Sequence, residues 1–243
     1  MEGIGVLQSA KTYYYVFRGA SLINVVCNIS RNRAYPDFKN DSKFNNLTEN
    51  TMEILFKANS FPNTLNTLMG IESNYLLRIG DANIPNNQLQ VATSVNNCTS
   101  ADLQLESGKW YHVAVAFNKG NVKVYINGVE KLSGSTGKSS VSLGAKHTNE
   151  EYGSRCFWVG YSYKDDRYFD GVVSEVRIWN RALTAEEIQA TNHFYTVEPE
   201  SEGLIAYWKF DEGSGTIAKD YSVSGYDLTI EKEPKWESVS LPQ

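Results

Sequence analysis

Residues 110–128 read WYHVAVAFNKGNVKVYING. Apolar side chains recur at every second position on both sides of the central Asn-Lys-Gly, and this is the period of a β-strand. The first half, residues 110–117, is largely apolar on both faces, which predicts a strand that is covered on both sides. Asn127 and Gly128 are two residues that readily adopt positive φ, as a type I′ turn requires, and they predict a hairpin over residues 121–131.

Short alternating segments of this kind recur along most of the chain. Further strands are predicted over residues 51–57, 75–79, 88–92, 156–161, 171–179 and 204–210. Residues 132–138 are rich in Ser and Gly and are expected to form a loop. Thr184 and Glu187 have the spacing of a capping box and predict a short helix over residues 184–190. One short helix among about a dozen strands indicates an all-β sandwich or barrel.

Three segments together carry a family resemblance. They are residues 110–114 (WYHVA) followed by 124–128 (VYING), residues 169–184 (FDGVVSEVRIWNRALT) leading into Glu187-Ile188, and residues 203–215 (GLIAYWKFDEGSG) followed by Asp220. In this order they resemble the laminin-G-like and pentraxin-like branch of the concanavalin A-like lectin/glucanase superfamily, over residues 50–240. The resemblance implies an antiparallel two-sheet jelly-roll sandwich. It also implies a non-catalytic binding module of the kind that ends exported or surface-anchored bacterial proteins.

The third segment opens the domain in many relatives, whereas here it follows the helix. Either a second repeat begins and is cut short, or the segment returns to complete the same sandwich. About forty residues cannot bury a core of their own, so we expect the second arrangement and a single domain over residues 1–243.

Composition excludes two classes of function. The formal net charge is -5 with no basic stripe, so the sequence does not predict nucleic-acid binding. No apolar run is long enough to cross a membrane. The chain starts without a signal peptide, and we expect a secreted or cell-surface protein whose signal sequence is absent from this sequence.

Neither a catalytic residue nor a cofactor is predicted. A glycosidase of this fold needs two carboxylates close together on one strand, whereas Glu53 is alone in its predicted strand. Glu175 has Arg177 as its alternate neighbour, which predicts a partly buried ion pair. Calcium is the open alternative, because the pentraxin pattern places Glu-Gln-Asp shortly after a Gly like Gly160. Here residues 162–164 read Ser-Tyr-Lys, and the lysine would oppose a cation.

A sugar site needs an exposed aromatic face and planar hydrogen-bonding groups. The loop of residues 161–168 is the densest such set, and a second predicted strand is expected to face it. The candidate carbohydrate-binding residues are Tyr161, Tyr163, Asp165, Asp166, Arg167, Tyr168, Tyr75 and Arg78, with Asn74 beside them. The alternative is that these tyrosines only cover the sandwich.

Other side chains have structural interpretations. Trp110, Trp179 and Trp208 are expected between the sheets, and His112 is expected to be a packed core histidine. The three cysteines are Cys27, expected to be a small buried hydrophobe, and Cys98 and Cys156, whose pairing is left open.

The leading hypothesis is thus a module that binds a glycan or another extracellular protein. A structural or protein-interaction module without a small ligand and a divergent glycoside hydrolase remain alternatives, and the oligomeric state is open.

Overall fold

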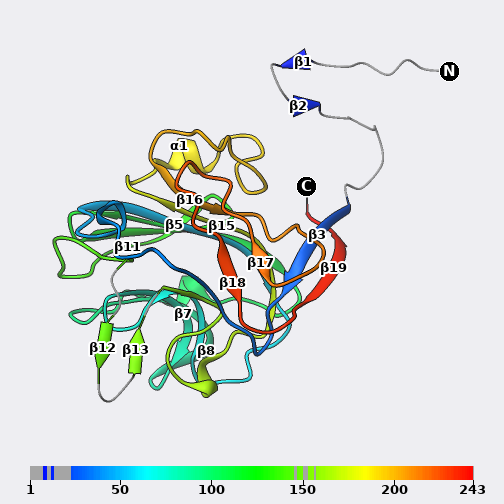
Figure 1. The fold of residues 1–243 in the computed structure, drawn as a ribbon. Coiled ribbons are helices and arrows are strands. Elements are labelled where there is room, and N and C mark those ends of the chain that lie inside the picture. Colours follow the sequence, from blue (N-terminus) through cyan, green and yellow to red (C-terminus); the bar gives the residue numbers. More distant parts are fainter. Residues whose placement is uncertain are drawn as a thin grey trace.

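The computed structural model describes residues 23–144 and 157–242, together with the strand residues 8–9, 12–13, 147–149 and 153–155. Two antiparallel sheets lie face to face with the core between them, and α1 lies on the outer face of one sheet (Figure 1). This is the all-β sandwich of the concanavalin A-like class that the sequence predicts.

The first sheet has eight strands in the order β11-β10-β9-β5-β15-β3-β19, with β16 also pairing with β15. Its strands are β3 (Ile23–Asn28), β5 (Glu49–Ala58), β9 (Trp110–Asn118), β10 (Asn121–Ile126), β11 (Val129–Ser135), β15 (Gly171–Trp179), β16 (Leu204–Trp208) and β19 (Lys235–Ser240).

The second sheet has seven strands in the order β17-β18-β4-β14-β6-β7-β8. They are β4 (Ala34–Pro36), β6 (Asn66–Ile71), β7 (Tyr75–Asp81), β8 (Ile84–Ala92), β14 (Trp158–Val159), β17 (Ile217–Ala218) and β18 (Leu228–Ile230). The remaining elements are the pairs β1 (Gln8–Ser9) with β2 (Thr12–Tyr13) and β12 (His147–Asn149) with β13 (Gly153–Arg155), the 3-10 turns η1 (Ser42–Phe44), η2 (Ala101–Leu103) and η3 (Asp165–Arg167), and α1 (Ala185–Ile188).

The local signals in the sequence act as expected at two places. Asn127 and Gly128 have φ values of 49° and 76° and join β10 to β11, with Ile126 opposite Val129. The Thr184 side chain accepts the Glu187 amide, and the Glu187 side chain accepts the Thr184 amide, so the capping box starts α1. The helix ends at Ile188, two residues earlier than predicted.

The predicted loop over residues 132–138 is wrong for its first half. Strand β11 continues to Ser135 and pairs with β10 along its length. Gly134 faces the side chain of Cys98, whose Sγ would lie 3.3 Å from an added Cβ. A small residue is therefore needed for close packing at this point and is no sign of a break in the strand.

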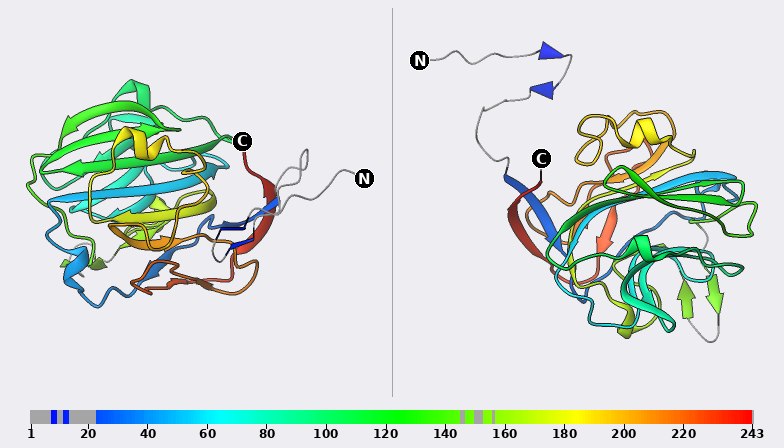
Figure 2. Two further views of the ribbon diagram at one scale, coloured as in Figure 1. Left: turned by 90° about the horizontal axis from the view of Figure 1, so that it is seen from above. Right: turned by 180° about the vertical axis from the view of Figure 1, so that it is seen from behind.

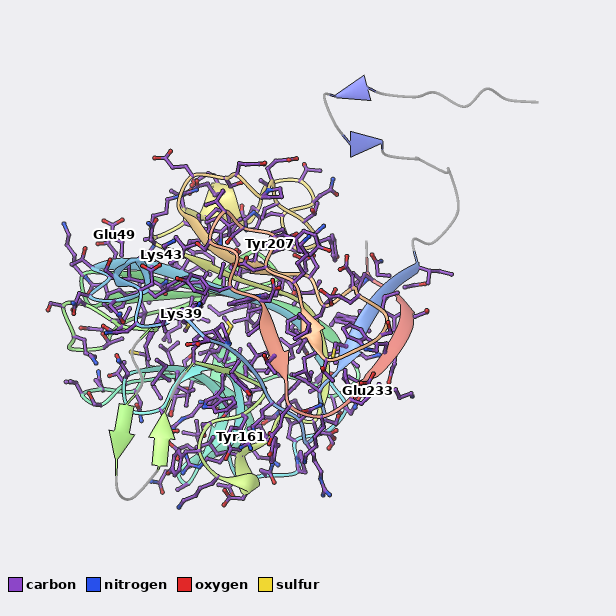
Figure 3. All side chains as sticks on the ribbon, in the orientation of Figure 1. Lys39, Lys43, Glu49, Tyr161, Tyr207 and Glu233 are labelled. Atoms are coloured by element: carbon purple, nitrogen blue, oxygen red, sulfur yellow. The ribbon has the colours of Figure 1, made fainter. Side chains whose placement is uncertain are left out.

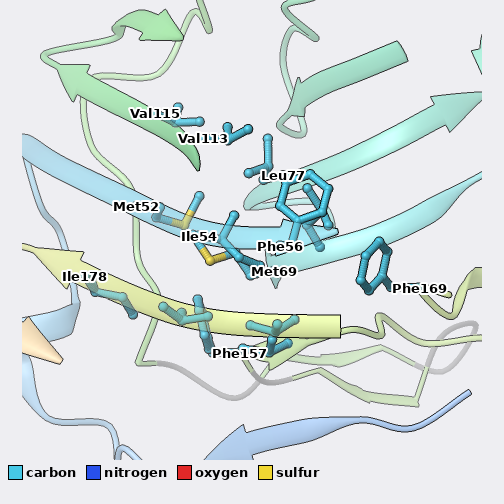
Figure 4. Close-up of a cluster of buried hydrophobic side chains, with 14 of the residues drawn as sticks. Met52, Ile54, Phe56, Met69, Leu77, Val113, Val115, Phe157, Phe169 and Ile178 are labelled. Carbon is cyan, nitrogen blue, oxygen red and sulfur yellow. The ribbon is translucent and has the colours of Figure 1, made fainter. Parts of the chain in front are cut away.

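The inner faces of the two sheets form the main core, part of which is drawn in Figure 4. Met52, Ile54 and Phe56 of β5 alternate toward it, and Met69 and Leu77 meet them from the second sheet. Trp208 is fully buried there, as predicted, and so is Cys27.

A second apolar cluster covers the outer face of the first sheet. Trp179 packs there with Leu183 and Ile188 beside α1, and Figure 2 shows α1 lying across the strands of this sheet. Trp179 is thus buried, but not between the sheets as expected. Trp110 is only half-buried, with the Lys57 ammonium 5.5 Å from its ring centre, so its assignment to the core was wrong. Both sides of β9 are apolar, and alternation alone cannot tell which side faces the other sheet.

The C-terminal segment returns to the same sandwich. Strand β16 pairs with β15, β18 pairs with β4, and β19 pairs with β3. Asp220 fixes this return, because its carboxylate accepts the amides of Tyr207, Ser222 and Tyr226. Strand β3 comes from the N-terminal stretch for which the sequence resemblance offered nothing.

Candidate functional site

The loop between β14 and β15 lies at the rim of the second sheet and contains η3. Figure 3 places Tyr161 on the side of the molecule away from Tyr207, which belongs to the α1 side. Tyr163 is half-buried, and the Arg167 guanidinium lies 4.5 Å from its ring centre. Asp166 is exposed at the tip of the loop.

Two tyrosines of the loop are more buried than a sugar-stacking role would need. Tyr161 and Tyr168 retain 6% and 9% of their exposure, with ring centres 4.8 Å apart. The Arg33 guanidinium lies 4.7 Å from the Tyr161 ring centre. These two rings therefore hold the loop in shape, and Tyr168 alone of the pair lines a surface hollow.

Arg78 joins this loop through Glu72. Its Nη1 lies 3.8 Å from Glu72 Oε1, and Arg167 Nη1 lies 3.2 Å from Glu72 Oε2. Arg78 also pairs with Asp81, and its Nε donates to Gln90 at 2.7 Å. The predicted convergence of Arg78 with the loop is present, although Arg78 itself is 6% exposed.

Tyr75 does not take part. Its ring is fully buried between the sheets, 5.7 Å from the Phe117 ring centre. Tyr75 and Arg78 are three positions apart on β7, and in a strand such residues point to opposite faces. Its expected place in a sugar site is therefore wrong. Asn74 is buried as well and accepts hydrogen bonds from the Lys138 ammonium.

Two surface hollows adjoin the loop and share Pro62 and Asn63. The Asp166 hollow, of about 370 Å³, is lined by Pro62, Asn63, Thr64, Leu65, Asp81, Ala82, Asp166 and Arg167. The Asp170 hollow, of about 600 Å³, is lined by Ser30, Arg31, Ser60, Pro62, Asn63, Tyr168, Phe169, Asp170 and Lys232. Asn63 Nδ2 donates to the Tyr168 carbonyl at 3.0 Å. This hydrogen bond ties the segment that contains Asn63 to the loop between β14 and β15.

A row of aromatic rings on the outer face of the second sheet was missed by the sequence reasoning. Trp158 has its ring centre 4.8 Å from that of Tyr35 and 5.3 Å from that of Tyr161. Arg33 lies over the Trp158 ring and pairs with Glu231. Strand β14 has only two residues, so alternation in the sequence gave no clear signal for the outward direction of Trp158.

A buried polar network lies on the outer face of the first sheet, under the segment that follows α1. Glu53 Oε1 lies 2.7 Å from His193 Nε2 and 3.3 Å from His112 Nε2, and Glu53 Oε2 accepts Trp179 Nε1 at 2.6 Å. Arg177 bonds Glu175 at 2.8 Å and donates to the His193 carbonyl at 2.6 Å. The predicted Glu175–Arg177 pair and packed His112 are confirmed; the meeting with Glu53 and His193 was not foreseen.

The pKa values of the two carboxyl groups in this network are shifted in opposite directions. Burial alone would raise the pKa of Glu53, but contacts from His112 and His193 and the charge of Arg177 outweigh it and hold that pKa well below its usual value. Burial raises the pKa of Glu175 to about 7, against the opposing effect of Arg177. Burial lowers the pKa of His112. Glu53 therefore favours its charged form, whereas Glu175 holds its proton more readily than a free glutamate does.

Glu53, His112 and His193 also have the donor set of a metal site, with ligand atoms within 4.8 Å of one another. The Arg177 Nη1 atom lies 3.6 Å from Glu53 Oε2 and would repel a cation there. The three side chains are therefore best explained as partners of each other and of Arg177.

The cysteines described by the structure carry free thiols. Cys98 is buried and its Sγ contacts the Ser135 carbonyl at 3.3 Å. Cys156, whose pairing with Cys98 the sequence left open, lies outside the described residues.

A laminin-G-type family model, described as the concanavalin A-like lectin/glucanases superfamily, matches residues 32–189, more than half of the chain. The chain belongs to this superfamily. A search of curated proteins finds no match.

Solved structures share the fold. A putative carbohydrate binding protein from Bacteroides ovatus superposes with a TM-score of 0.74 and 28% identity over 90% of this chain, and this chain spans 61% of that protein. Domain 4 of AbnA, a GH43 extracellular arabinanase from Geobacillus stearothermophilus in complex with arabinotriose, gives a TM-score of 0.51 and 21% identity, covering 78% of this chain and 81% of that one. A SAP-like pentraxin from Limulus polyphemus gives 0.48 and 16%, covering 70% and 82%.

In the part of the chain that the structure describes, none of the helices has the length and apolar character needed to cross a membrane.

Proposed function

We propose that the protein is a non-catalytic carbohydrate-binding module and that the sugar occupies the Asp166 and Asp170 hollows. The observation that carries this proposal is that Pro62 and Asn63 line both hollows, which places them side by side along the loop of residues 161–170; the two hollows together are called the recess. The similarity to the Bacteroides ovatus protein, which is itself named a putative carbohydrate binding protein, supports it.

The chemistry of the recess suits a sugar chain. Tyr168 and Phe169 line the Asp170 hollow but are only 9% and 1% exposed, so polar groups rather than stacked rings must supply most of the contacts. Asn63, Asp166 and Arg167 offer planar groups that match pairs of hydroxyls. Hydrogen bonds of this kind bind weakly and specifically, because each replaces a similar bond to water.

The buried acids support a non-catalytic role. Hydrolysis of a glycosidic bond uses two carboxyl groups that face the substrate about 5–9 Å apart. Glu53 and Glu175, the acids of the polar network, are 1% and 5% exposed and are engaged by Trp179 and Arg177. A substrate could reach them only if the segment after α1 moved away.

We further propose that residues 23–242 act as one unit within an exported or cell-surface protein and that the partner is an extracellular glycan. A glycan on the cell exterior or in the medium would be within reach of such a module. This placement rests on the family resemblance.

Binding of the isolated chain to a glycan array, followed by calorimetry on the best ligand, tests the proposal. Asp166→Ala and Tyr163→Ala should each weaken binding by about 1 kcal/mol or more, because the first removes a lining group and the second releases Arg167. Tyr195→Ala is the matched control: its ring is half-buried beside Phe194, in the segment after α1. It should leave the affinity unchanged.

Equal affinities in the parent, Asp166→Ala and Tyr163→Ala proteins would place the sugar elsewhere. The next candidate would be the α1 hollow, of about 620 Å³, which Lys123, Tyr125 and Glu186 help to line. Binding to no glycan on the array would contradict the function itself.

A further inference from the structure

The two halves of the recess carry opposite charge. Asp81 and Asp166 outnumber Arg167 in the lining of the Asp166 hollow. Arg31 and Lys232 outnumber Asp170 in the lining of the Asp170 hollow. A cationic hollow is unexpected on a chain whose formal net charge is -5. The ligand that occupies this hollow is therefore expected to be negatively charged, unlike a ligand of the acidic remainder of the surface.

The two cations are brought together by a buried asparagine. Asn32 is 5% exposed, and its Nδ2 donates to the Lys232 carbonyl at 2.7 Å while its Oδ1 accepts the Lys232 amide at 3.2 Å. The Glu231 amide donates to the Arg33 carbonyl at 3.0 Å. These bonds join segments 200 residues apart, so Arg31 and Lys232 rise from two adjacent and fixed stretches of backbone.

The charge nearest to them is already engaged. Asp170 Oδ1 accepts the Ser30 hydroxyl at 2.7 Å, and Oδ2 accepts the Ser60 hydroxyl. Among the described residues, no carboxylate lies within ion-pair distance of Arg31 or Lys232. Glu231 pairs instead with Arg33, and the Glu233 carboxylate accepts the Gly215 amide. The two cations are thus available to an anion that enters the hollow.

We propose that the Asp170 hollow binds the carboxylate of an acidic sugar, a uronic acid residue of a polysaccharide. This deepens the proposed function and rests on it. The Arg31 guanidinium can take both carboxylate oxygens, and Lys232 adds a second positive charge. Tyr168, which is 9% exposed, also lines this hollow. Neighbouring sugars of the chain then extend past Asn63 into the Asp166 hollow.

Polymers that share a backbone and differ mainly in charge give the sharpest test. Oligogalacturonate and its fully methyl-esterified form share one backbone, and esterification removes the carboxylate charge while adding one methyl group to each sugar. Alginate oligomers provide a second uronate, chondroitin sulfate provides a sulfate ester, and arabinan and xylan oligomers provide neutral chains. Calorimetry with the full chain at low and at moderate salt measures each affinity.

We expect a uronate to bind at least about tenfold more tightly than its ester or a neutral chain, and this preference should shrink as salt rises. Arg31→Gln and Lys232→Gln should each weaken uronate binding by about tenfold and leave the melting temperature unchanged, because both side chains are exposed. Lys119→Gln and Lys131→Gln, two exposed cations of the first sheet's β9–β10 turn and β11, should change nothing.

Tight binding of esterified or neutral chains that is insensitive to Arg31→Gln and Lys232→Gln would overturn this inference and leave the proposed function standing. Preference for chondroitin sulfate over every uronate would overturn the carboxylate assignment. Absence of binding to all of these probes and to a glycan array would overturn both proposals.

Discussion

The two tryptophans Trp208 and Trp110 allow one substitution to be compared in two environments. Both were expected in the core, but Trp208 is fully buried and Trp110 is half-buried. The Trp208 ring centre lies 6.2 Å from that of Phe157 and 6.3 Å from that of Phe38, and its Nε1 donates to the Tyr226 carbonyl at 2.8 Å. Trp208→Ala would open a cavity at this point and leave that carbonyl without its donor.

The expected loss for Trp208→Ala is about 3–5 kcal/mol of unfolding free energy, the usual cost of truncating a buried tryptophan. Trp110→Ala should cost only about 1 kcal/mol, because the ring is half-buried and its contact with the half-buried Lys57 is a cation–π pair. In a domain of this size each kcal/mol corresponds to about 2–4 °C in melting temperature. We therefore expect falls of about 6–20 °C for Trp208→Ala and about 2–4 °C for Trp110→Ala.

Urea unfolding followed by far-UV circular dichroism measures the difference, since both variants lose a fluorophore. The dependence of free energy on urea should stay the same in the parent and both variants, which would show that the same surface unfolds in each. Equal losses in the two variants would refute the reasoning, because burial between the sheets would then not decide the cost.

Three single residues give further predictions. Because burial raises the pKa of Glu175 to about 7, the folded protein holds a proton that the unfolded chain releases near pH 4.5. The stability that this group contributes is therefore full below pH 4.5 and is lost as the pH rises to 7. Across that range the parent should lose up to about 3 kcal/mol of unfolding free energy relative to Glu175→Gln. His112 has the opposite effect on stability, but it is present in both proteins and so cancels in the comparison. A pH dependence that is identical in the two proteins would contradict this assignment. Gly128→Ala should destabilise the fold by about 1–2 kcal/mol in thermal unfolding, since φ is +76° and the new Cβ would lie 3.1 Å from Phe194; an unchanged melting temperature would argue against that turn geometry. Asp220→Ala should cost at least about 3 kcal/mol in urea unfolding because three backbone amides lose their acceptor, and a loss below about 1 kcal/mol would mean that water replaces it.

Part of the candidate site was predictable. The tyrosines and charges between residues 161 and 168 marked the loop, and the structure joins Arg78 to Arg167 of that loop through Glu72. Tyr75 was misplaced, because a residue on a strand can be assigned to a face only when the register of that strand is known. The aromatic neighbours of the loop, Tyr35 and Trp158, lie on short strands with too few residues for a clear alternation.

Sequence alone determined the features that depend on neighbouring residues. Alternation along residues 110–126, the Asn127-Gly128 turn and the capping box at Thr184 each express backbone preferences within a few positions of one another. They predicted an all-β fold with one short helix, and the family resemblance implied the two-sheet sandwich. Only the tertiary structure decided which side chains meet across the sheets. Glu53 reaches His193 across 140 positions, and Asn32 holds Lys232 beside Arg31 across 200. Such pairings are set by strand order and register, which no local pattern encodes. The pairing of Asn32 with Lys232 is the one that builds the proposed site.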